Sequence, residues 1–254
     1  DPGKTVLVVI IVVLTIAFIF SAVSGVAKGI QWLSNTNMVL ALILALFVFV
    51  AGPTLLILNL LPTALGDYAS QMTEMASRTA ASGDDAMKDW LASWTIFYWA
   101  WWVSWTPFVG MFIARISRGR TIRQFVTGVL IVPSLVSLVW FAVFGGTAID
   151  IQRTTGKLVD SAGAVNTDSA LFQMLDQLPL ASVTTVLVMV LVGIFFVSGA
   201  DAASIVMGTL SERGSTEPSK RSVVFWGTVM GGVAAIMLII GGDDALNGLQ
   251  RITI

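Results

Sequence analysis

The sequence predicts an all-α integral membrane protein with six transmembrane helices. Of its 254 residues, 56% are hydrophobic and 11% are charged, whereas a soluble domain carries about 25% charged residues. Residues 5–27 and 29–66 contain no charge, and about 20 apolar residues are enough to cross the hydrocarbon core. The first run is also longer than a signal-peptide apolar region of roughly 7–15 residues. Both runs therefore predict membrane helices rather than a cleaved leader.

Hydropathy places the expected spans at about 5–24, 38–61, 91–114, 124–145, 182–208 and 222–241. The segment 62–90 is too polar to span, but four apolar residues recur in it at helical spacing: Leu65, Tyr68, Met72 and Met75. This pattern predicts an amphipathic helix along the outer interface, ended by Gly-Asp-Asp at 83–85. The polar loop 146–181 is expected to hold one short helix over 170–178. Gly227 and Gly231 form a G-x-x-x-G that permits close helix packing.

Basic residues indicate the orientation. They cluster between the third and fourth spans and between the fifth and sixth, on one side of the membrane, together with Lys28. The clusters are Arg115, Arg118, Arg120 and Arg123, and Arg213, Lys220 and Arg221. Since Lys and Arg accumulate in cytoplasmic loops, loops 115–123 and 211–221 are expected in the cytoplasm and both chain ends outside.

The composition excludes several kinds of chemistry. The chain has no cysteine and no histidine, which removes disulfides, thiol chemistry, the usual haem and zinc ligand sets and histidine-based acid–base catalysis. An intramembrane hydrolase would need a lysine partner for a serine, or two buried acids, and the predicted spans hold no lysine and one acid. We therefore expect no enzyme activity. A membrane scaffold whose tryptophans only pack is the remaining non-transport alternative.

An aromatic stripe runs along the third predicted span. At about 100° per residue, five rings share one face of a helix: Tyr98, Trp101, Trp102, Trp105 and Phe108. An interfacial belt explains Trp90, Trp94 and Trp99, but the deeper rings lie roughly 16–23 Å along the helix from Trp90. Indole faces attract quaternary ammonium groups. The stripe thus favours a cation cage, with helix packing as the alternative, and Pro107 predicts a kink or break beside it.

A polar spot interrupts the fifth predicted span. Asp201 is the one acid within a predicted span, and Phe195 and Ser198 lie on roughly the same side of that helix. Ser198 and loosened backbone carbonyls offer the oxygens that Na⁺ prefers. The alternative is that Ser198 bonds back within its own helix and Gly199 only permits close packing. Asp201 is also a candidate charge partner for Arg115 at the cytoplasmic mouth.

Three segments resemble one known family. Residues 97–123 (FYWAWWVSWTPFVGMFIARISRGRTIR), 195–204 (FFVSGADAAS) and 24–38 (SGVAKGIQWLSNTNM) are similar to the betaine–choline–carnitine transporter family, and the likeness extends over essentially the whole chain. It is closest to the sodium-coupled glycine betaine transporters. The tryptophan-dense run followed by ARISRGR is the most specific part of this resemblance.

The resemblance implies a LeuT-like fold of twelve helices with two inverted repeats, forming a homotrimer. The six spans would be helices six to eleven, so that the chain looks like a fragment. Residues 1–61 would then end the first repeat, 62–90 would be the outer connector, and 91–254 would form most of the second repeat. A multi-pass location in the plasma (inner) membrane follows, with the bilayer as a partner and no nucleic acid.

The resemblance also implies roles for particular residues. Trp101, Trp102 and Trp105 would belong to the aromatic substrate box, with Tyr98 beside them on the stripe, and Phe108 would lie near a sodium site and the gate. The second sodium site would use Phe195, by its carbonyl, and Ser198. At the next position Gly199 stands where the sodium-coupled members carry a hydroxyl.

The function expected from these observations is secondary transport of glycine betaine or a related quaternary ammonium osmolyte. Na⁺ symport by alternating access is the expected mechanism, with Na⁺ as coupling ion and no other cofactor. Two alternatives stay open within the same family: Na⁺-independent exchange of choline or carnitine, and H⁺ coupling through Asp201.

Overall fold

The computed structural model describes residues 3–24, 29, 31–159, 163–215 and 217–252, with side chains described as far as residue 241, and this part of the chain is helical. In chain order the elements are α1 (Lys4–Ser24), α2 (Gln31–Ala51), α3 (Thr54–Ser77), α4 (Asp85–Trp90), the π-helix η2 (Leu91–Ile96), α5 (Phe97–Ile116), α6 (Ile122–Thr155), α7 (Ala170–Asp176), α8 (Ala181–Ser211) and α9 (Lys220–Ile252). Lys28, counted above with the basic side, lies outside the described residues.

Five helices within the described residues are long and apolar enough to cross a membrane: α1, α2, α6, α8 and the Lys220–Gly241 part of α9. The predicted number of six spans is therefore not confirmed. The predicted span 91–114 corresponds to η2 and α5, whose tryptophans, hydroxyls and Pro107 lower its mean hydropathy.

The predicted span 38–61 is wrong in its position. The chain forms α2 over Gln31–Ala51, turns at Gly52 and Pro53, and begins α3 at Thr54. Proline lacks an N–H and disfavours helical geometry in the residue before it, so Gly52-Pro53 separates two helices. The separate amphipathic helix expected over 62–90 is also not found, because α3 continues through Pro62 to Ser77. The break predicted at 83–85 lies earlier, since α3 ends at Ser77 and α4 begins at Asp85. Asp84 caps α4 by accepting a hydrogen bond from the Met87 amide.

Packing divides the chain into two units. Unit 1 comprises Asp1–Asn35, Arg78–Arg118 and Gly193–Ile254, and unit 2 comprises Thr36–Ser77 and Gly119–Val192. The two units are defined by which residues contact one another, and not by internal similarity of structure. The predicted division into inverted repeats therefore stays a prediction.

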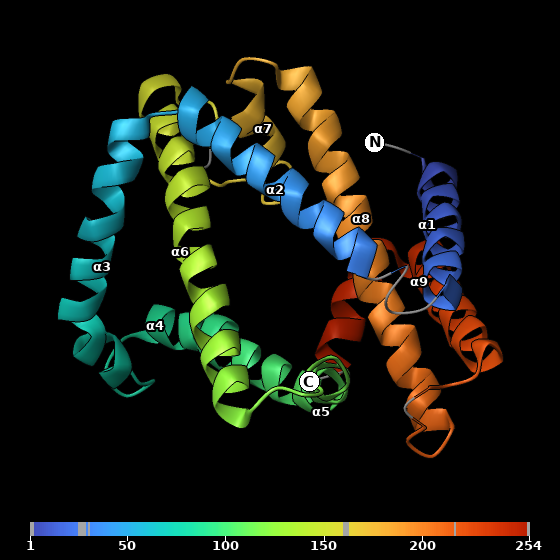
Figure 1. Cartoon of the computed structure of the whole chain (residues 1–254). Coiled ribbons are helices and arrows are strands. Elements are labelled where there is room, and N and C mark those ends of the chain that lie inside the picture. Colours follow the sequence, from blue (N-terminus) through green and yellow to red (C-terminus); the bar gives the residue numbers. More distant parts are fainter. Residues whose placement is uncertain (1–2, 25–28, 30, 160–162, 216, 253–254) are drawn as a thin grey trace. The chain divides into compact units, whose positions relative to one another are not determined.

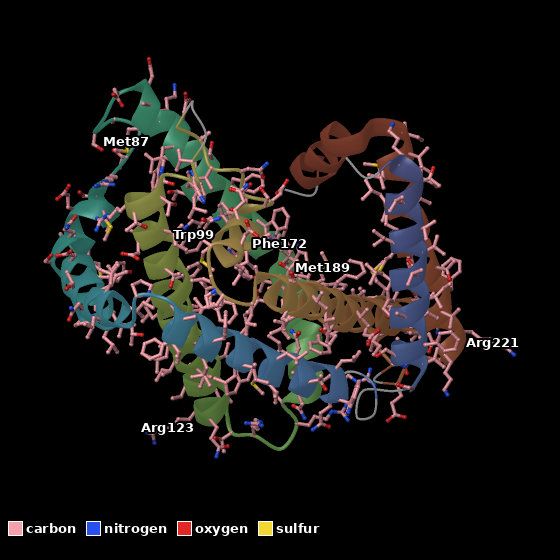
Figure 2. All side chains as sticks on the ribbon, turned by 90° about the horizontal axis from the view of Figure 1, so that it is seen from above. Met87, Trp99, Arg123, Phe172, Met189 and Arg221 are labelled. Carbon is pink, nitrogen blue, oxygen red and sulfur yellow. The ribbon has the colours of Figure 1, made fainter. Side chains whose placement is uncertain are left out.

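Unit 2 holds the larger apolar core. Leu44, Val48 and Ile57 from α2 and α3 are buried against Phe144 and Ile151 of α6, and α3 lies beside α6 (Figure 1). The short helix expected over 170–178 is confirmed as α7, whose Phe172 packs on this core (Figure 2). The loop expected from 146 onward begins ten residues later. α6 continues to Thr155, and this added part places buried Ile151 in the core and buries Thr147 as well.

Unit 1 is built around the pairing of α1 with α9 (Figure 1). A Cβ atom added at Gly227 would lie 2.9 Å from the Phe18 ring and 3.0 Å from Ile19, and one at Gly231 would collide with Thr15. Close approach of the two helices therefore requires glycine at both positions. The close packing that G-x-x-x-G permits is confirmed, and its partner is α1.

A carboxylate bridges the connection from α8 to α9. Glu212 accepts hydrogen bonds from the backbone and hydroxyl of Ser219 and from the Ser222 hydroxyl. These donors hold the pKa of Glu212 below its ordinary value. Because Ser219 directly precedes α9, Glu212 ties the end of one helix to the beginning of the next.

Candidate substrate and ion site

The aromatic residues of α5 form a continuous ladder on one face of the helix. Trp101 stacks on Trp105 with ring centroids 6.2 Å apart and planes at 11°, and Trp105 meets Phe108 edge to face at 6.4 Å. Phe97 extends the ladder by contacting Trp101 at 5.7 Å. We call Phe97, Trp101, Trp105 and Phe108 the ring ladder. Spacings of three and four residues bring these rings together because such positions are neighbours on a helix.

The other two predicted aromatic site residues lie beside the ladder. Tyr98 stacks on Trp94 at 5.6 Å and meets Phe97 edge to face. Trp102 has no ring contact among the described residues and is 67% exposed. The structure therefore joins Trp101, Trp105 and Phe108 in one row and places Tyr98 and Trp102 next to it.

The helix is not broken at Pro107, since α5 is continuous from Phe97 to Ile116. The kink expected there as the alternative stays a prediction. The irregular backbone lies earlier instead, in the π-helix of Leu91–Ile96 that precedes α5. π-Bulges are frequent at functional sites, but no pattern in the sequence predicted this one.

A cavity of about 520 Å³ opens beside the ring ladder; we call it the Trp105 cavity. Its walls come from α5, from the part of α8 in unit 1 and from α9: Ser104, Trp105, Phe108, Ala203, Met207 and Met230. Ser104 turns its hydroxyl back to the Trp101 carbonyl at 2.7 Å. The cavity thus presents two aromatic rings and two thioethers, surfaces that suit a weakly hydrated cation. Sequence reasoning missed both methionines, which nothing distinguished from other apolar residues.

The predicted sodium ligands of α8 lie in the same unit. The Ser198 hydroxyl donates to the Phe195 carbonyl oxygen at 2.9 Å, as the back-bonding alternative expected. The same bond brings together the two oxygens proposed as cation ligands. A Cβ at Gly199 would meet nothing within 4 Å, so this glycine is not required by packing among the described residues.

Asp201 is fully buried in α8 and accepts a hydrogen bond from Ser21 of α1. Its Oδ1 atom and the Nη1 atom of Arg115 are both buried, and neither has a hydrogen-bond partner among the described residues. The suggested Asp201–Arg115 pair is thus not formed in this conformation and stays a prediction. The sequence analysis missed Ser21, because no sequence pattern indicates a contact between residues that lie 180 positions apart.

Helices of membrane-spanning length, together with a row of rings beside an apolar cavity, define a multi-pass membrane protein with a surface suited to small organic cations. Comparison with known proteins makes the class specific. The sequence model described as BCCT, betaine/carnitine/choline family transporter, matches residues 1–254, and the chain belongs to this family. It is accordingly a multi-pass plasma-membrane protein of a transporter family, not of an enzyme family.

Individual relatives are similar over nearly all of the chain. It is 49% identical over 251 residues to the betaine/ectoine transporter LcoP of Corynebacterium glutamicum, covering 99% of this chain and 39% of that protein. It is 44% identical over 238 residues to the glycine betaine transporter OpuD of Bacillus subtilis, covering 94% and 46%. An ectoine/hydroxyectoine transporter of Virgibacillus pantothenticus is 41% identical over 244 residues, covering 95% and 48%. The chain thus spans less than half the length of these relatives.

Proposed function

We propose that the complete protein containing this chain is a secondary transporter of glycine betaine or a closely related quaternary ammonium osmolyte. Family membership and relatives named for betaine support this substrate class. The ring ladder is the observation that carries the proposal. A trimethylammonium group has no N–H to donate, so aromatic faces suit it better than hydrogen-bond acceptors do.

The ladder offers this group a defined place. Trp105 and Phe108 both line the Trp105 cavity. Trp101, which does not line the cavity, stacks on Trp105. Each indole face is worth roughly 0.5–2 kcal/mol to a cation within about 6 Å of the ring, depending on desolvation. Trp102 and Tyr98, on neighbouring positions of the same helix, would complete the aromatic surface with residues from outside this chain.

We propose Na⁺ as the coupling ion. The Phe195 carbonyl and the Ser198 hydroxyl, 2.9 Å apart, would supply two oxygens once the hydroxyl rotates away from the carbonyl, and Phe108 would border a second ion. One Na⁺ moving down about 100 mV contributes about 2.3 kcal/mol before its concentration gradient is counted. Na⁺-independent exchange and H⁺ coupling through Asp201 are the competing mechanisms. A homotrimer, as the resemblance implies, remains an expectation.

Uptake of radiolabelled glycine betaine into proteoliposomes tests the proposal. The complete protein should accumulate betaine with an inward Na⁺ gradient, and Trp105→Ala should lose most of this uptake. Trp99→Ala is the matched control, because Trp99 is exposed and lies outside the ring ladder (Figure 2). Uptake indifferent to Na⁺ would refute the coupling. Absence of betaine, choline and carnitine uptake under any gradient would refute the substrate class.

Ectoine is a second candidate substrate, favoured by the relatives named for betaine/ectoine and ectoine/hydroxyectoine transport. Competition of unlabelled ectoine with labelled betaine would detect it. A failure to compete at a large excess would restrict the site to methylated ammonium compounds.

A further inference from the structure

A second cavity lies beyond the ring ladder, and arginine gives it a positive charge. It has a volume of about 260 Å³, and we call it the Arg115 cavity. Its walls come from the end of α5, from α8 and from the two connections that follow them, and include Met111, Phe112, Arg115, Arg118, Ile205 and Thr209. Like the Trp105 cavity, it is lined by residues of α5 and α8 within unit 1.

Arg115 continues the row of rings on α5. Trp101, Phe108 and Arg115 are each seven residues apart, so they share one face of the helix at successive pairs of turns. Phe108 and Arg115 are about 10.5 Å apart along the axis. Helical side chains lean toward the N-terminus, which brings the guanidinium back toward Phe108. Met111 and Phe112, which lie between them on α5, line the same cavity as Arg115.

The guanidinium of Arg115 has a buried donor that finds no partner in the part of the chain that the structure describes. Its Nη1 atom is buried without a hydrogen-bond acceptor among the described residues. A buried donor left unpaired is costly, more so when it is charged. Asp201 on α8 does not accept from Arg115, since one of its oxygens accepts from Ser21 and the other has no partner among the described residues. A planar guanidinium in an apolar cavity is suited to bind a carboxylate by two parallel hydrogen bonds.

We propose that the Arg115 cavity is a second binding station, which receives the carboxylate of a zwitterionic substrate as its ammonium group leaves the ring ladder. This inference rests on the proposed function. Rings attract the ammonium end and offer nothing to the carboxylate end, so a substrate passing Phe108 needs a cationic partner further along. Arg115 is a positively charged group on the same face of the same helix, two turns away.

Ligand binding by the purified complete protein, followed by tryptophan fluorescence, tests this station. Glycine betaine and choline share the trimethylammonium group, but only the first has a carboxylate. Arg115→Gln should weaken glycine betaine binding about 10- to 100-fold, the range expected for a lost hydrogen bond between charged groups, and leave choline binding unchanged. Arg115→Lys should weaken it less. Arg123→Gln, an exposed arginine in the first turn of α6 (Figure 2), is the control and should change neither.

Each other result has a defined meaning. If Arg115→Gln weakens the binding of both ligands equally, or of neither, the proposed second binding station is refuted while the proposed function stays intact. An Asp201→Asn variant that reproduces the Arg115→Gln pattern would also overturn it, because Arg115 would then act by pairing with Asp201. If Arg115→Gln binds neither ligand and is unfolded, Arg115→Lys decides by whether its loss is confined to glycine betaine. A wild-type protein that does not bind glycine betaine would overturn the proposed function and this inference together.

Discussion

Alanine in place of Gly227 or Gly231 is expected to weaken the packing of α1 against α9. The new methyl group at Gly227 would lie 2.9 Å from the Phe18 ring and 3.0 Å from Ile19, whereas carbon atoms prefer separations of about 3.5–4.0 Å. At Gly231 it would collide with Thr15. Phe18 is almost fully buried, so it has little room to move away.

The magnitude follows from two opposing effects. Overpacking in a close-fitting interface costs about 1–3 kcal/mol, while replacing glycine by alanine within a helix returns about 1 kcal/mol of helix propensity. Gly232→Ala separates the two effects, because a Cβ at Gly232 meets nothing within 4 Å. The free energy of unfolding of Gly227→Ala or Gly231→Ala should therefore fall about 1–3 kcal/mol below that of Gly232→Ala.

The assay is reversible unfolding of the complete protein in mixed micelles with increasing SDS, followed by circular dichroism. If Gly227→Ala and Gly231→Ala unfold at the same SDS fraction as Gly232→Ala, the close approach of α1 and α9 is not set by these glycines. That result would refute the steric argument.

Three further predictions concern other parts of the chain. Gly199→Ser should fold normally and lower the Na⁺ concentration that half-saturates uptake by a few-fold, because it adds a hydroxyl beside Ser198, and one polar contact contributes on this scale. Glu212→Gln should destabilise the protein near neutral pH and flatten its pH dependence of stability. Because the pKa of Glu212 is lowered in the folded protein, its carboxylate stabilises the fold above about pH 4.3, the ordinary glutamate pKa. This stabilisation is lost as the pH falls through the pKa that Glu212 has in the folded protein. Thr121→Ala should lower the free energy of unfolding by about 1 kcal/mol, since the capping box of α6 is lost.

Each of these has a matched control and an outcome that would contradict it. Gly193→Ser places a hydroxyl at another open glycine of α8; an equal gain in Na⁺ affinity there would exclude a local effect of Gly199. Glu217→Gln removes a neighbouring exposed charge, and thermal unfolding across pH 3–7 should distinguish it from Glu212→Gln. Thr127→Ala, an exposed site within α6, should not lower the melting temperature; a loss equal to that of Thr121→Ala would contradict the role of the cap.

Much of this architecture could be predicted from local sequence, because helices in a membrane satisfy their own backbone hydrogen bonds. The charge-free runs predicted membrane helices, and the spacing of Trp101, Trp105 and Phe108 predicted a common face. The predicted span was wrong where hydropathy and backbone geometry disagreed. Hydropathy remains high across Gly52-Pro53, so the predicted second span ran through a point where the backbone turns.

By itself, the sequence determined the family, the helical class and the row of rings on α5, because each depends on residues close together along the chain. Only the tertiary structure decided which residues meet across helices: Ser21 with Asp201, Thr15 with Gly231, and Arg115 with Ile205 around one cavity. The physical reason is that periodicity fixes the face on which a side chain lies but not the helix that covers it. That partner depends on the close packing of side chains between helices, which no local pattern encodes.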